Sequence, residues 1–372
     1  MAFTSALFFF ANLNICAIER NSVILRAKKN NETLKNEILE RYNRVCICGG
    51  GSLGHVVSAV LSTKDCKVSL LTTRPDKWSK TLEVTDFNMN KYTAHFDCIS
   101  ANPKDVISKC DIVLVCLPGF AIETTLKQIQ PYITTQAVGS IVCSSGFFLY
   151  AHDIFPKQQK LYGFQRVPYI ARTEEYGKSA HILGDKNKLF ITTENIIDND
   201  FIDFWQFVFN KPIERLGSYL QATLTNSNPL LHPSRLYSLW HDWHEGIYYN
   251  QCPRFYSDWD DYTSQLYIAC DNELHLLTNK YNVELPTVLE YYESYDASSL
   301  TRKLRSIESF KNLNAPMICT EKGYVPDFNN RYFTEDIPFG MQHIQNLARK
   351  ENIPTPTIDK ILQWGYKVLN KN

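Results

Sequence analysis

A glycine-rich turn between two short apolar runs is the feature that most restricts how this chain can fold. Residues 44–48 read RVCIC, and Gly49, Gly51 and Gly54 follow them directly in a G-x-G-x-x-G pattern. A helix-like segment at residues 55–62 and a second apolar run at residues 67–71 come next. Strand, glycine turn, helix and strand within about thirty residues make the βαβ unit of a doubly wound sheet. The sequence therefore predicts an α/β N-terminal domain of the Rossmann type with a parallel, doubly wound sheet.

Apolar runs further along the chain supply other strands of this sheet. Residues 111–117 and 139–144 are rich in Val, Ile, Leu and Cys, and residues 121–133 between them have apolar side chains at helical spacing. Strands that are apolar throughout are buried on both faces, which is typical of parallel sheets covered by helices. A weaker alternation continues through residues 160–164, 179–183 and 189–193.

The character of the sequence changes near Ser218. Long aromatic-rich stretches follow, which we predict to be helices, at residues 236–243, 262–281 and 339–349. We therefore expect three parts, with a domain boundary near Leu216: an N-terminal extension at residues 1–40, a dinucleotide-binding Rossmann domain at residues 41–215, and a mainly α-helical substrate domain at residues 216–372.

The balance of charge excludes one broad class of partner. Lys and Arg together number 39, Asp and Glu also number 39, and no Lys/Arg-rich run occurs. Proteins that bind nucleic acids present a basic patch that neutralises phosphates. We therefore expect no nucleic-acid partner.

The cysteines indicate the compartment. Eleven are scattered along the chain, and Cys46, Cys48, Cys116 and Cys143 lie in apolar runs, where a free thiol packs as a small hydrophobic group. The odd total and the irregular spacing argue against a disulfide framework and favour a reducing compartment. We therefore expect a cytoplasmic protein.

An apolar stretch at residues 6–18, ALFFFANLNICAI, is similar in composition to a signal peptide. No Lys or Arg precedes it, no clear small-x-small cleavage site follows it, and it is too short and too polar to span a bilayer. We interpret it as an extension that lies on the globular domain, or as an over-long start, and we expect no membrane association.

The glycine turn is predicted to bind the phosphates of a dinucleotide. Gly49 permits the tight turn, Gly51 lets backbone N–H groups approach the pyrophosphate, and Gly54 lets the helix pack on the strand. Unpaired N–H groups at the start of the helix, at Ser52 and Leu53, then face the phosphates. The alternative is a glycine turn without a ligand. The strand before the turn, and the helix and strand after it, argue against that alternative.

The residues after the second apolar run bear on the choice of cofactor. An NAD enzyme usually places an acid about twenty residues past the glycines, where it holds both ribose hydroxyls. Here the chain has Thr72, Thr73 and Arg74. Small hydroxyl groups and a guanidinium suit the 2′-phosphate of NADP, because Arg presents a bidentate fork to phosphate oxygens. NADP is favoured, and NAD is the alternative, in which Asp76 holds the ribose and Arg74 points into solvent.

Two polar segments in the second half of the chain contain residues suited to acid–base chemistry. Residues 226–233 read NSNPLLHP, with His232 between Leu and Pro. Residues 331–340 read RYFTEDIPFG, with an Arg five residues before Asp336. Taken alone, the first segment is explained by a buried His bonded to a backbone carbonyl, and the second by surface salt bridges.

With these segments the chain resembles the octopine/nopaline (opine) dehydrogenases. The resemblance covers most of residues 44–372. It rests on the glycine turn, on C-L-P-G ending at Gly119, on P-Y-x-x-R at residues 168–172, on N-P-x-x-H-P and on R-Y-x-T-E-D-x-P-x-G. The last two motifs are specific, and their order and separation also fit. The N-terminal extension and the Thr73–Arg74 pair depart from the family pattern.

The resemblance implies roles for individual residues. His232 and Asp336 are implied to form an acid–base dyad, Arg331 to engage a substrate carboxylate, and Asn228 to lie beside the reacting groups. Pro118 is implied to lie beside the cofactor. The implied reaction joins the amine of an amino acid to a 2-oxo acid such as pyruvate, and NAD(P)H then reduces the imine. These residue types suit that chemistry, because Arg clamps carboxylates, His exchanges protons near neutral pH, and nicotinamide supplies the hydride.

Two alternatives remain at this point. A reductase of the ketopantoate or glycerol-3-phosphate type has the same two-domain plan but typically relies on a Lys and lacks the two specific motifs. A non-catalytic nucleotide sensor has no need of His232, Asp336 and Arg331. The HDWHE sequence at residues 241–245 lacks the spacing of a two-His zinc motif, so we expect no metal. The sequence leaves the oligomeric state open, a homodimer included.

Overall fold

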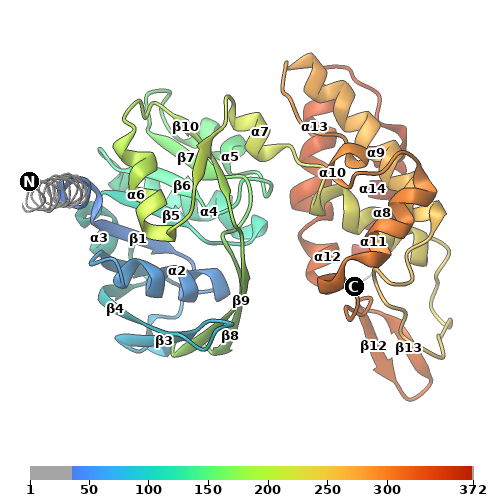
Figure 1. Cartoon of the computed structure of the whole chain (residues 1–372), viewed down its shortest axis with the longest axis horizontal. Coiled ribbons are helices and arrows are strands. Elements are labelled where there is room, and N and C mark those ends of the chain that lie inside the picture. The colour runs from blue at the N-terminus through green and yellow to red at the C-terminus, as the bar shows by residue number, and fades with distance from the viewer. Residues whose placement is uncertain (1–35, 371–372) are drawn as a thin grey trace, which may run out of the picture.

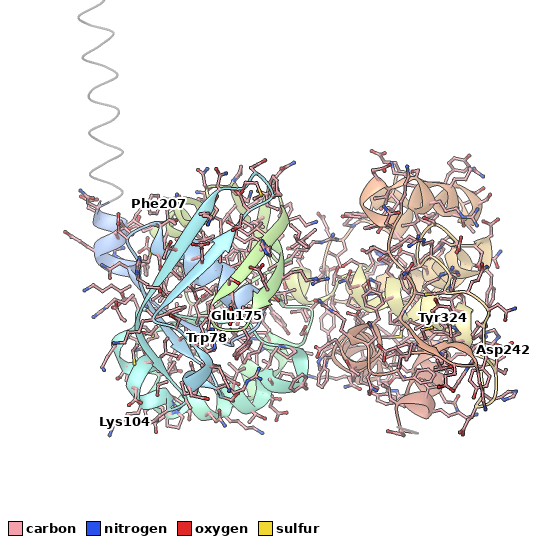
Figure 2. The ribbon with its side chains drawn as sticks, turned by 90° about the horizontal axis from the view of Figure 1, so that it is seen from below. Trp78, Lys104, Glu175, Phe207, Asp242 and Tyr324 are labelled. Atoms are coloured by element: carbon pink, nitrogen blue, oxygen red, sulfur yellow. The ribbon has the colours of Figure 1, made fainter. Side chains whose placement is uncertain are left out.

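The computed structural model describes residues 36–370, which form two domains side by side (Figure 1). The first holds a large sheet with helices on both faces, and the second is mainly helical. The chain passes from one to the other at α7 (Tyr219–Thr223). In the view from below, Trp78 and Glu175 lie in the sheet domain, and Asp242 and Tyr324 lie in the helical domain (Figure 2). The predicted order of an α/β domain and a helical domain is confirmed.

The predicted βαβ unit is present. β1 (Arg44–Cys48), α2 (Ser52–Ser62) and β2 (Lys67–Leu71) follow one another, and β1 pairs with β2 in parallel register. The helix begins at Ser52, three residues earlier than the sequence indicated, because the extended backbone of Gly51 leads directly into its first turn. The glycine turn therefore joins the carboxyl end of β1 to the N-terminus of α2.

The sheet has the strand order β11-β10-β7-β6-β5-β1-β2-β4-β3-β9-β8. β1 lies between β2 and β5 and is parallel to both, so the strand order reverses there. In open α/β sheets, ligands bind outside the carboxyl ends of the strands at such a reversal. The other strands are β3 (Thr81–Thr85), β4 (Lys91–Ser100), β5 (Ile112–Val115), β6 (Ala137–Ser140), β7 (Leu161–Phe164), β8 (Tyr169–Glu175), β9 (Ser179–Asp185), β10 (Leu189–Glu194) and β11 (Ile213–Arg215).

Both faces of the sheet are buried, as side-chain alternation along β1 shows. Val45 and Ile47 belong to an apolar cluster with α2, whereas Cys46 and Cys48 belong to a second cluster on the opposite face. All four side chains are completely buried, and the cysteines of the described residues are free thiols. The predicted strand, buried on both faces, is confirmed. The other helices of this domain are α3 (Pro103–Val106), α4 (Gly119–Ile129), α5 (Phe147–Ile154) and α6 (Asp200–Phe209), besides a helical turn at residues 36–42.

The sheet is longer and less uniform than the sequence indicated. The pairs β3–β4 and β8–β9 are antiparallel, and β10 runs antiparallel to β7. Most of these strands lack a continuous apolar run, since exposed side chains alternate with buried ones along β3 and much of β4. β6 also ends at Ser140 instead of continuing to residue 144. The Ser140 hydroxyl donates to the backbone oxygen of Val142 at 2.7 Å, and the chain turns there.

The helical domain is organised around α8 (Asn228–Trp240) and α9 (Asp261–Lys280), which pack against each other. α9 matches its predicted bounds to within one residue, because Asp260 caps it by accepting from the Thr263 backbone N–H. α8 begins eight residues earlier than expected. The first half of this helix was not predicted from the sequence, because Pro233 lies within it and proline removes a helical hydrogen bond.

The remaining elements of this domain complete a second apolar core. They are α10 (Val288–Tyr291), α11 (Ala297–Ser306), α12 (Arg331–Thr334), a π-helical turn (Ile337–Met341), α13 (Gln342–Lys350), α14 (Pro356–Leu369) and a hairpin of β12 (Met317–Thr320) and β13 (Gly323–Pro326).

Three sequence-based expectations concern the ends of these domains. The boundary near Leu216 falls in the link between β11 and α7. Most of the N-terminal extension, with the apolar stretch at residues 6–18, lies outside the described residues. Within residues 36–370, no helix has both the length and the apolar character needed to cross a membrane.

Arg235 is a buried cation that fixes the loop before α9. Only 1% of its surface is exposed, and its guanidinium donates to the backbone oxygens of Phe255 at 3.0 Å and Asp258 at 2.6 Å. It also contacts the carboxylate of Asp260 at 3.3 Å. Burial lowers the pKa of Arg235, and the charge of Asp260 opposes this effect. The loop at residues 255–260 therefore has a fixed backbone.

Replacing Arg235 with Met keeps an apolar stem and removes the donors, which leaves two backbone oxygens without their partner. We expect the free energy of unfolding to fall by about 3 kcal/mol, measured by urea denaturation followed by circular dichroism. Arg254→Met, an exposed position on the same loop, is the control and should cost less than about 1 kcal/mol. Equal losses in the two variants would contradict this account of the loop.

Candidate active site

The glycine turn has a shape that only glycine permits at two positions. Gly49 has φ +123°, and a Cβ there would lie 2.5 Å from the backbone oxygen of Cys116. A Cβ at Gly54 would lie 2.1 Å from the backbone oxygen of Gly49. By contrast, no atom lies within 4 Å of the Cβ position of Gly51, which faces open space. The turn is therefore closed on the protein side and open on the solvent side.

The open side of the turn coincides with the start of α2. Gly51 is the cap residue and offers no side chain to the first N–H groups of the helix, those near Ser52 and Leu53. These N–H groups have no partner within the helix, and the helix dipole adds partial positive charge there. The Ser52 hydroxyl is already used, because it accepts from the Thr173 backbone N–H at 3.0 Å. The arrangement fits a pyrophosphate held by backbone donors.

Arg74 and Tyr176 form a cationic corner beside this turn. The Arg74 guanidinium lies over the Tyr176 ring at 4.2 Å, and the Tyr176 hydroxyl is 3.5 Å from the Thr72 hydroxyl. Burial opposes ionisation of Tyr176, but hydrogen bonding with Thr72 and the charge of Arg74 lower its pKa overall. Arg74 makes no ion pair with any described residue, and Thr73 beside it is exposed. Tyr176 comes from the β8–β9 hairpin, which the sequence did not reveal.

Pro118 marks a point where the two domains meet. It caps α4, directly after β5, and is exposed. The next residue, Gly119, donates its backbone N–H to the carboxylate of Glu335 at 2.8 Å. A Cβ at Gly119 would lie 2.3 Å from Cβ of Phe339, so the close approach requires glycine. The segment that begins at Arg331 therefore docks at the carboxyl end of the sheet.

His232 and Asp336 are brought together by α8 and this docked segment. The His232 Nδ1 and the Asp336 Oδ2 are 2.7 Å apart, and the two residues are 5% and 9% exposed. An ionised Asp accepts hydrogen bonds only, so Nδ1 carries the proton and Nε2 is left as an acceptor. The structure thus pairs the two residues that the sequence singled out, which lie 104 positions apart in the chain.

Two tyrosines that the sequence analysis did not assign complete the surroundings of His232. The Tyr256 hydroxyl is 3.1 Å from Nε2, and the Tyr332 ring stacks on the imidazole with centroids 3.9 Å apart. Burial raises the pKa of both phenols, and the charge of Asp336 adds to this effect. A neutral Tyr256 donates its proton to Nε2 when the imidazole is neutral. Tyr332 had a sequence signal, its place beside Arg331, whereas Tyr256 comes from a separate loop.

Arg331 and Asn228 lie near this pair with free side chains. Arg331 begins α12 and is exposed, and within residues 36–370 its guanidinium makes no ion pair or hydrogen bond. Among the described residues, Arg331 therefore does not form the surface salt bridge that was the alternative explanation of this segment. Asn228 is exposed at the start of α8, and it lies on the same helix face as His232, one turn away. The charge of Arg172 on β8 also acts on Tyr332, which places a second cation near this group.

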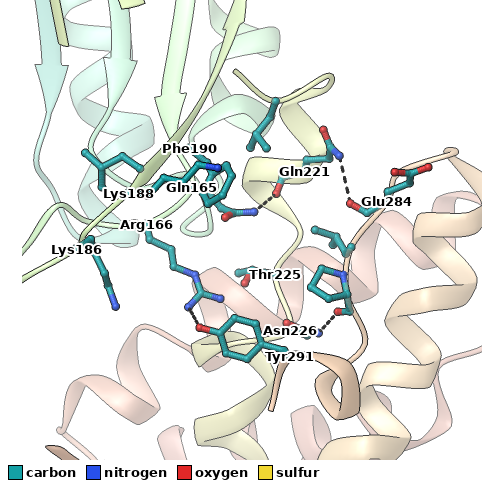
Figure 3. Close-up of a pocket in the computed structure, with 14 residues that line it drawn as sticks. Gln165, Arg166, Lys186, Lys188, Phe190, Gln221, Thr225, Asn226, Glu284 and Tyr291 are labelled. Atoms are coloured by element: carbon teal, nitrogen blue, oxygen red, sulfur yellow. Dashed lines mark hydrogen bonds between the residues drawn. The ribbon is translucent and has the colours of Figure 1, made fainter. Parts of the chain in front are cut away.

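A cavity of about 400 Å³ lies between the two domains (Figure 3). Arg166 and Lys186 enter it from the sheet domain, and Tyr291 faces Arg166 from the helical domain. Arg166 Nη1 donates to the Tyr291 hydroxyl at 2.9 Å. Gln165 donates to the backbone oxygen of Gln221 at 2.9 Å, a second contact across the interface. Among the described residues, no group of three or more His, Cys, Asp or Glu side chains is arranged to hold a metal ion.

Comparison with known proteins assigns a family to this arrangement. Residues 215–369 match the family described as NAD/NADP octopine/nopaline dehydrogenase, alpha-helical domain, and residues 45–144 match ketopantoate reductase PanE/ApbA. Tauropine dehydrogenase of Arabella iricolor is 30% identical over 365 residues, which cover 87% of this chain and 91% of that protein. The chain belongs to the octopine/nopaline dehydrogenase family.

Other relatives agree with this membership. Octopine dehydrogenase of Mizuhopecten yessoensis is 28% identical, over 88% of this chain and 90% of that protein. The solved structure of octopine dehydrogenase with NADH and L-arginine has a TM-score of 0.79 at 24% identity, covering 88% of this chain and 89% of that one. The NADP⁺-bound structure of yersinopine dehydrogenase has a TM-score of 0.68 at 13% identity, covering 89% and 92%. The two structures share the two-domain fold.

As a family member, the protein is an NAD(P)-dependent opine-type dehydrogenase, so the predicted family, fold class and enzyme class are confirmed. The family model of ketopantoate reductase matches residues 45–144 alone, and the helical domain matches the model of the opine family instead. A glycerol-3-phosphate dehydrogenase from Acinetobacter baylyi is similar over only 35% of this chain.

Proposed function

We propose that this protein condenses the amine of an amino acid with a 2-oxo acid such as pyruvate and reduces the imine with NADPH. The observation that carries this proposal is the buried His232–Asp336 pair beside the unpaired guanidinium of Arg331. The relatives' names agree with it, since solved structures of octopine dehydrogenase hold NADH with pyruvate or with L-arginine. Buried free thiols in β1 also support a reducing, cytoplasmic location.

The cofactor in this proposal lies along the carboxyl end of β1. The turn at Gly49, Gly51 and Gly54, with the N–H groups of Ser52 and Leu53, would hold the pyrophosphate. Pro118, the cap residue of α4 after β5, would contact the nicotinamide half. The nicotinamide supplies the hydride that reduces the imine carbon.

NADP is proposed over NAD because of the cationic corner. Thr73 and Arg74 are exposed, Arg74 has no carboxylate partner among the described residues, and Tyr176 supports its guanidinium by stacking. A 2′-phosphate would supply the missing counter-charge through charge-assisted hydrogen bonds. Asp76, which an NAD ribose would require, lies in a short helical turn after Arg74 and is also exposed.

Arg331 is proposed to bind the carboxylate of the 2-oxo acid. A planar guanidinium with no protein partner can form two parallel hydrogen bonds to a carboxylate, which orients the carbonyl carbon. Asn228, one turn from His232, adds an amide that can donate or accept beside that carbon.

His232 is proposed to exchange the protons of the reaction. The amine adds to the carbonyl carbon, a proton passes to the leaving hydroxyl, and water departs to give the imine. Asp336 keeps the Nδ1 proton in place and stabilises the imidazolium, so that Nε2 accepts and returns the mobile proton. In this structure the Tyr256 hydroxyl occupies the Nε2 lone pair, so the substrate takes the place of this hydrogen bond when Nε2 exchanges the proton.

His232→Ala should lower turnover by roughly 10²–10⁴-fold, the usual contribution of a general acid–base group. Asp336→Asn should also lower turnover, and the losses should not add in the double variant, because the two residues act as one unit. Steady-state rates with saturating substrates test this. His241→Ala, exposed at the end of the same helix, is the control. A well-folded His232→Ala enzyme within a few-fold of wild-type turnover would refute the dyad.

Arg331→Lys keeps the charge and loses the planar fork, so KM for the 2-oxo acid should rise about tenfold or more. Cofactor affinity, measured by fluorescence quenching without substrate, should stay the same. Arg302→Lys, at an exposed position on α11, provides the matched control. Unchanged kinetics in Arg331→Lys would remove Arg331 from the substrate site.

Arg74→Ala should raise KM for NADPH at least several-fold and leave KM for NADH almost unchanged, because only NADPH loses a charge-assisted contact of about 1.5–3 kcal/mol. Lys77→Ala, an exposed cation three residues away, should affect neither cofactor in this selective way. If both cofactors respond equally to Arg74→Ala, Arg74 does not recognise the 2′-phosphate.

A further inference from the structure

The interdomain cavity is built at the carboxyl edge of the sheet. Gln165 and Arg166 follow β7 directly, and Lys186 and Lys188 lie in the link before β10 (Figure 3). β7 pairs with β6 and β6 with β5, so this wall continues the edge at which the cofactor turn lies. The cavity therefore opens on the same side of the sheet as the proposed active site.

The wall of the cavity on the side of the helical domain is continuous with α8, the helix that carries His232. Thr225 and Asn226 line the cavity immediately before α8, the helix that carries Asn228 in its first turn and His232 in its second. One helical turn rises about 5.4 Å. The cavity wall therefore continues into the helix that carries the His232 side of the dyad.

The cavity has an excess of positive charge. Lys186 makes no ion pair with any described residue, and Arg166 bonds only to the neutral Tyr291. Lys188 is neutralised, because it pairs with Glu214. Glu284 is the one acidic residue among those that line the cavity, and its carboxylate points away from Arg166 and Lys186 (Figure 3).

Arg166 is positioned to bind an anion. Its guanidinium lies over the Tyr291 ring at 5.0 Å and uses one N–H for the Tyr291 hydroxyl. A guanidinium has five N–H donors, so several remain for a ligand. Tyr291 is held in turn by α10, whose first turn is closed by a capping box between Thr287 and Glu290. The Arg166 guanidinium, which comes from the sheet domain, is thus held by a tyrosine of the helical domain.

We propose that this cavity binds the far end of the amine substrate and selects amines whose far end is a carboxylate or a sulfonate. Arg166 and Lys186 would hold that anion, and the same two charges would repel a guanidinium or an ammonium group. This inference rests on the proposed function, since it concerns the amine partner of the same reaction. It names acidic amino acids and amino sulfonates as the substrate class.

The test is a set of initial rates of NADPH and NADH oxidation with pyruvate and single amines. L-Aspartate, L-glutamate, β-alanine and taurine form the acidic arm, and L-arginine, L-lysine and agmatine form the basic arm. We expect kcat/KM to be at least about tenfold higher in the acidic arm, the effect of one charge-assisted contact. Higher values for the basic arm would overturn the proposal and leave the proposed function intact. No oxidation with any amine would overturn both.

The variants Lys186→Glu and Arg166→Gln test whether the cavity causes the preference for acidic amines. Each should lower the ratio of acidic to basic kcat/KM about tenfold or more, and Lys186→Glu should also improve the use of L-arginine. Lys160→Glu, an exposed lysine at the opposite edge of the sheet, is the matched control for the change of charge. Cofactor binding and melting temperature show that each variant is folded. A ratio that changes equally in Lys186→Glu and Lys160→Glu, or in neither, would overturn the proposal.

Discussion

The hydrogen bond from the Gly119 backbone N–H to the carboxylate of Glu335 is the contact on which the site depends. It joins the end of β5 to the segment of the helical domain that carries the next residue, Asp336, and Phe339 lies directly on the same glycine. Burial raises the pKa of Glu335, and the bond to Gly119 opposes that rise by favouring the charged form. Because this contact sets how the segment meets the sheet, it also sets where Asp336 lies relative to the glycine turn.

Asp336, Tyr256 and Tyr332 hold the His232 imidazole in place. Asp336 binds one nitrogen of His232, Tyr256 binds the other, and Tyr332 covers a face of the ring. Tyr256 belongs to the loop that the buried Arg235 fixes through two backbone oxygens. Arg235 thereby helps to fix the tyrosine hydroxyl that contacts Nε2, the nitrogen proposed to exchange protons, and general acid–base catalysis requires such fixed geometry.

Charge is distributed unevenly over a chain whose formal net charge is zero. Arg74, Arg331 and Lys186 make no ion pair with any described residue, which they share with other surface cations such as Lys77 and Lys160. The first three lie at the domain interface or at the carboxyl edge of the sheet. Unpaired cations there suit the anions of the proposed reaction, a phosphate and two acid groups, and Coulomb attraction between them is strongest where water is partly excluded.

The sequence by itself determined the elements whose signals are local. The glycine turn, the apolar strand β1 and α9 lie where the sequence placed them, since backbone freedom, burial on both faces and a side-chain cap are all decided by neighbouring residues. It also singled out His232 and Asp336, but only the tertiary structure brought them within 2.7 Å, across 104 positions of chain. The antiparallel strands, Tyr256, Tyr176 and the cavity at Arg166 were decided by the tertiary structure alone. Their environment comes from contacts between distant segments, and no pattern of spacing along the chain records such contacts.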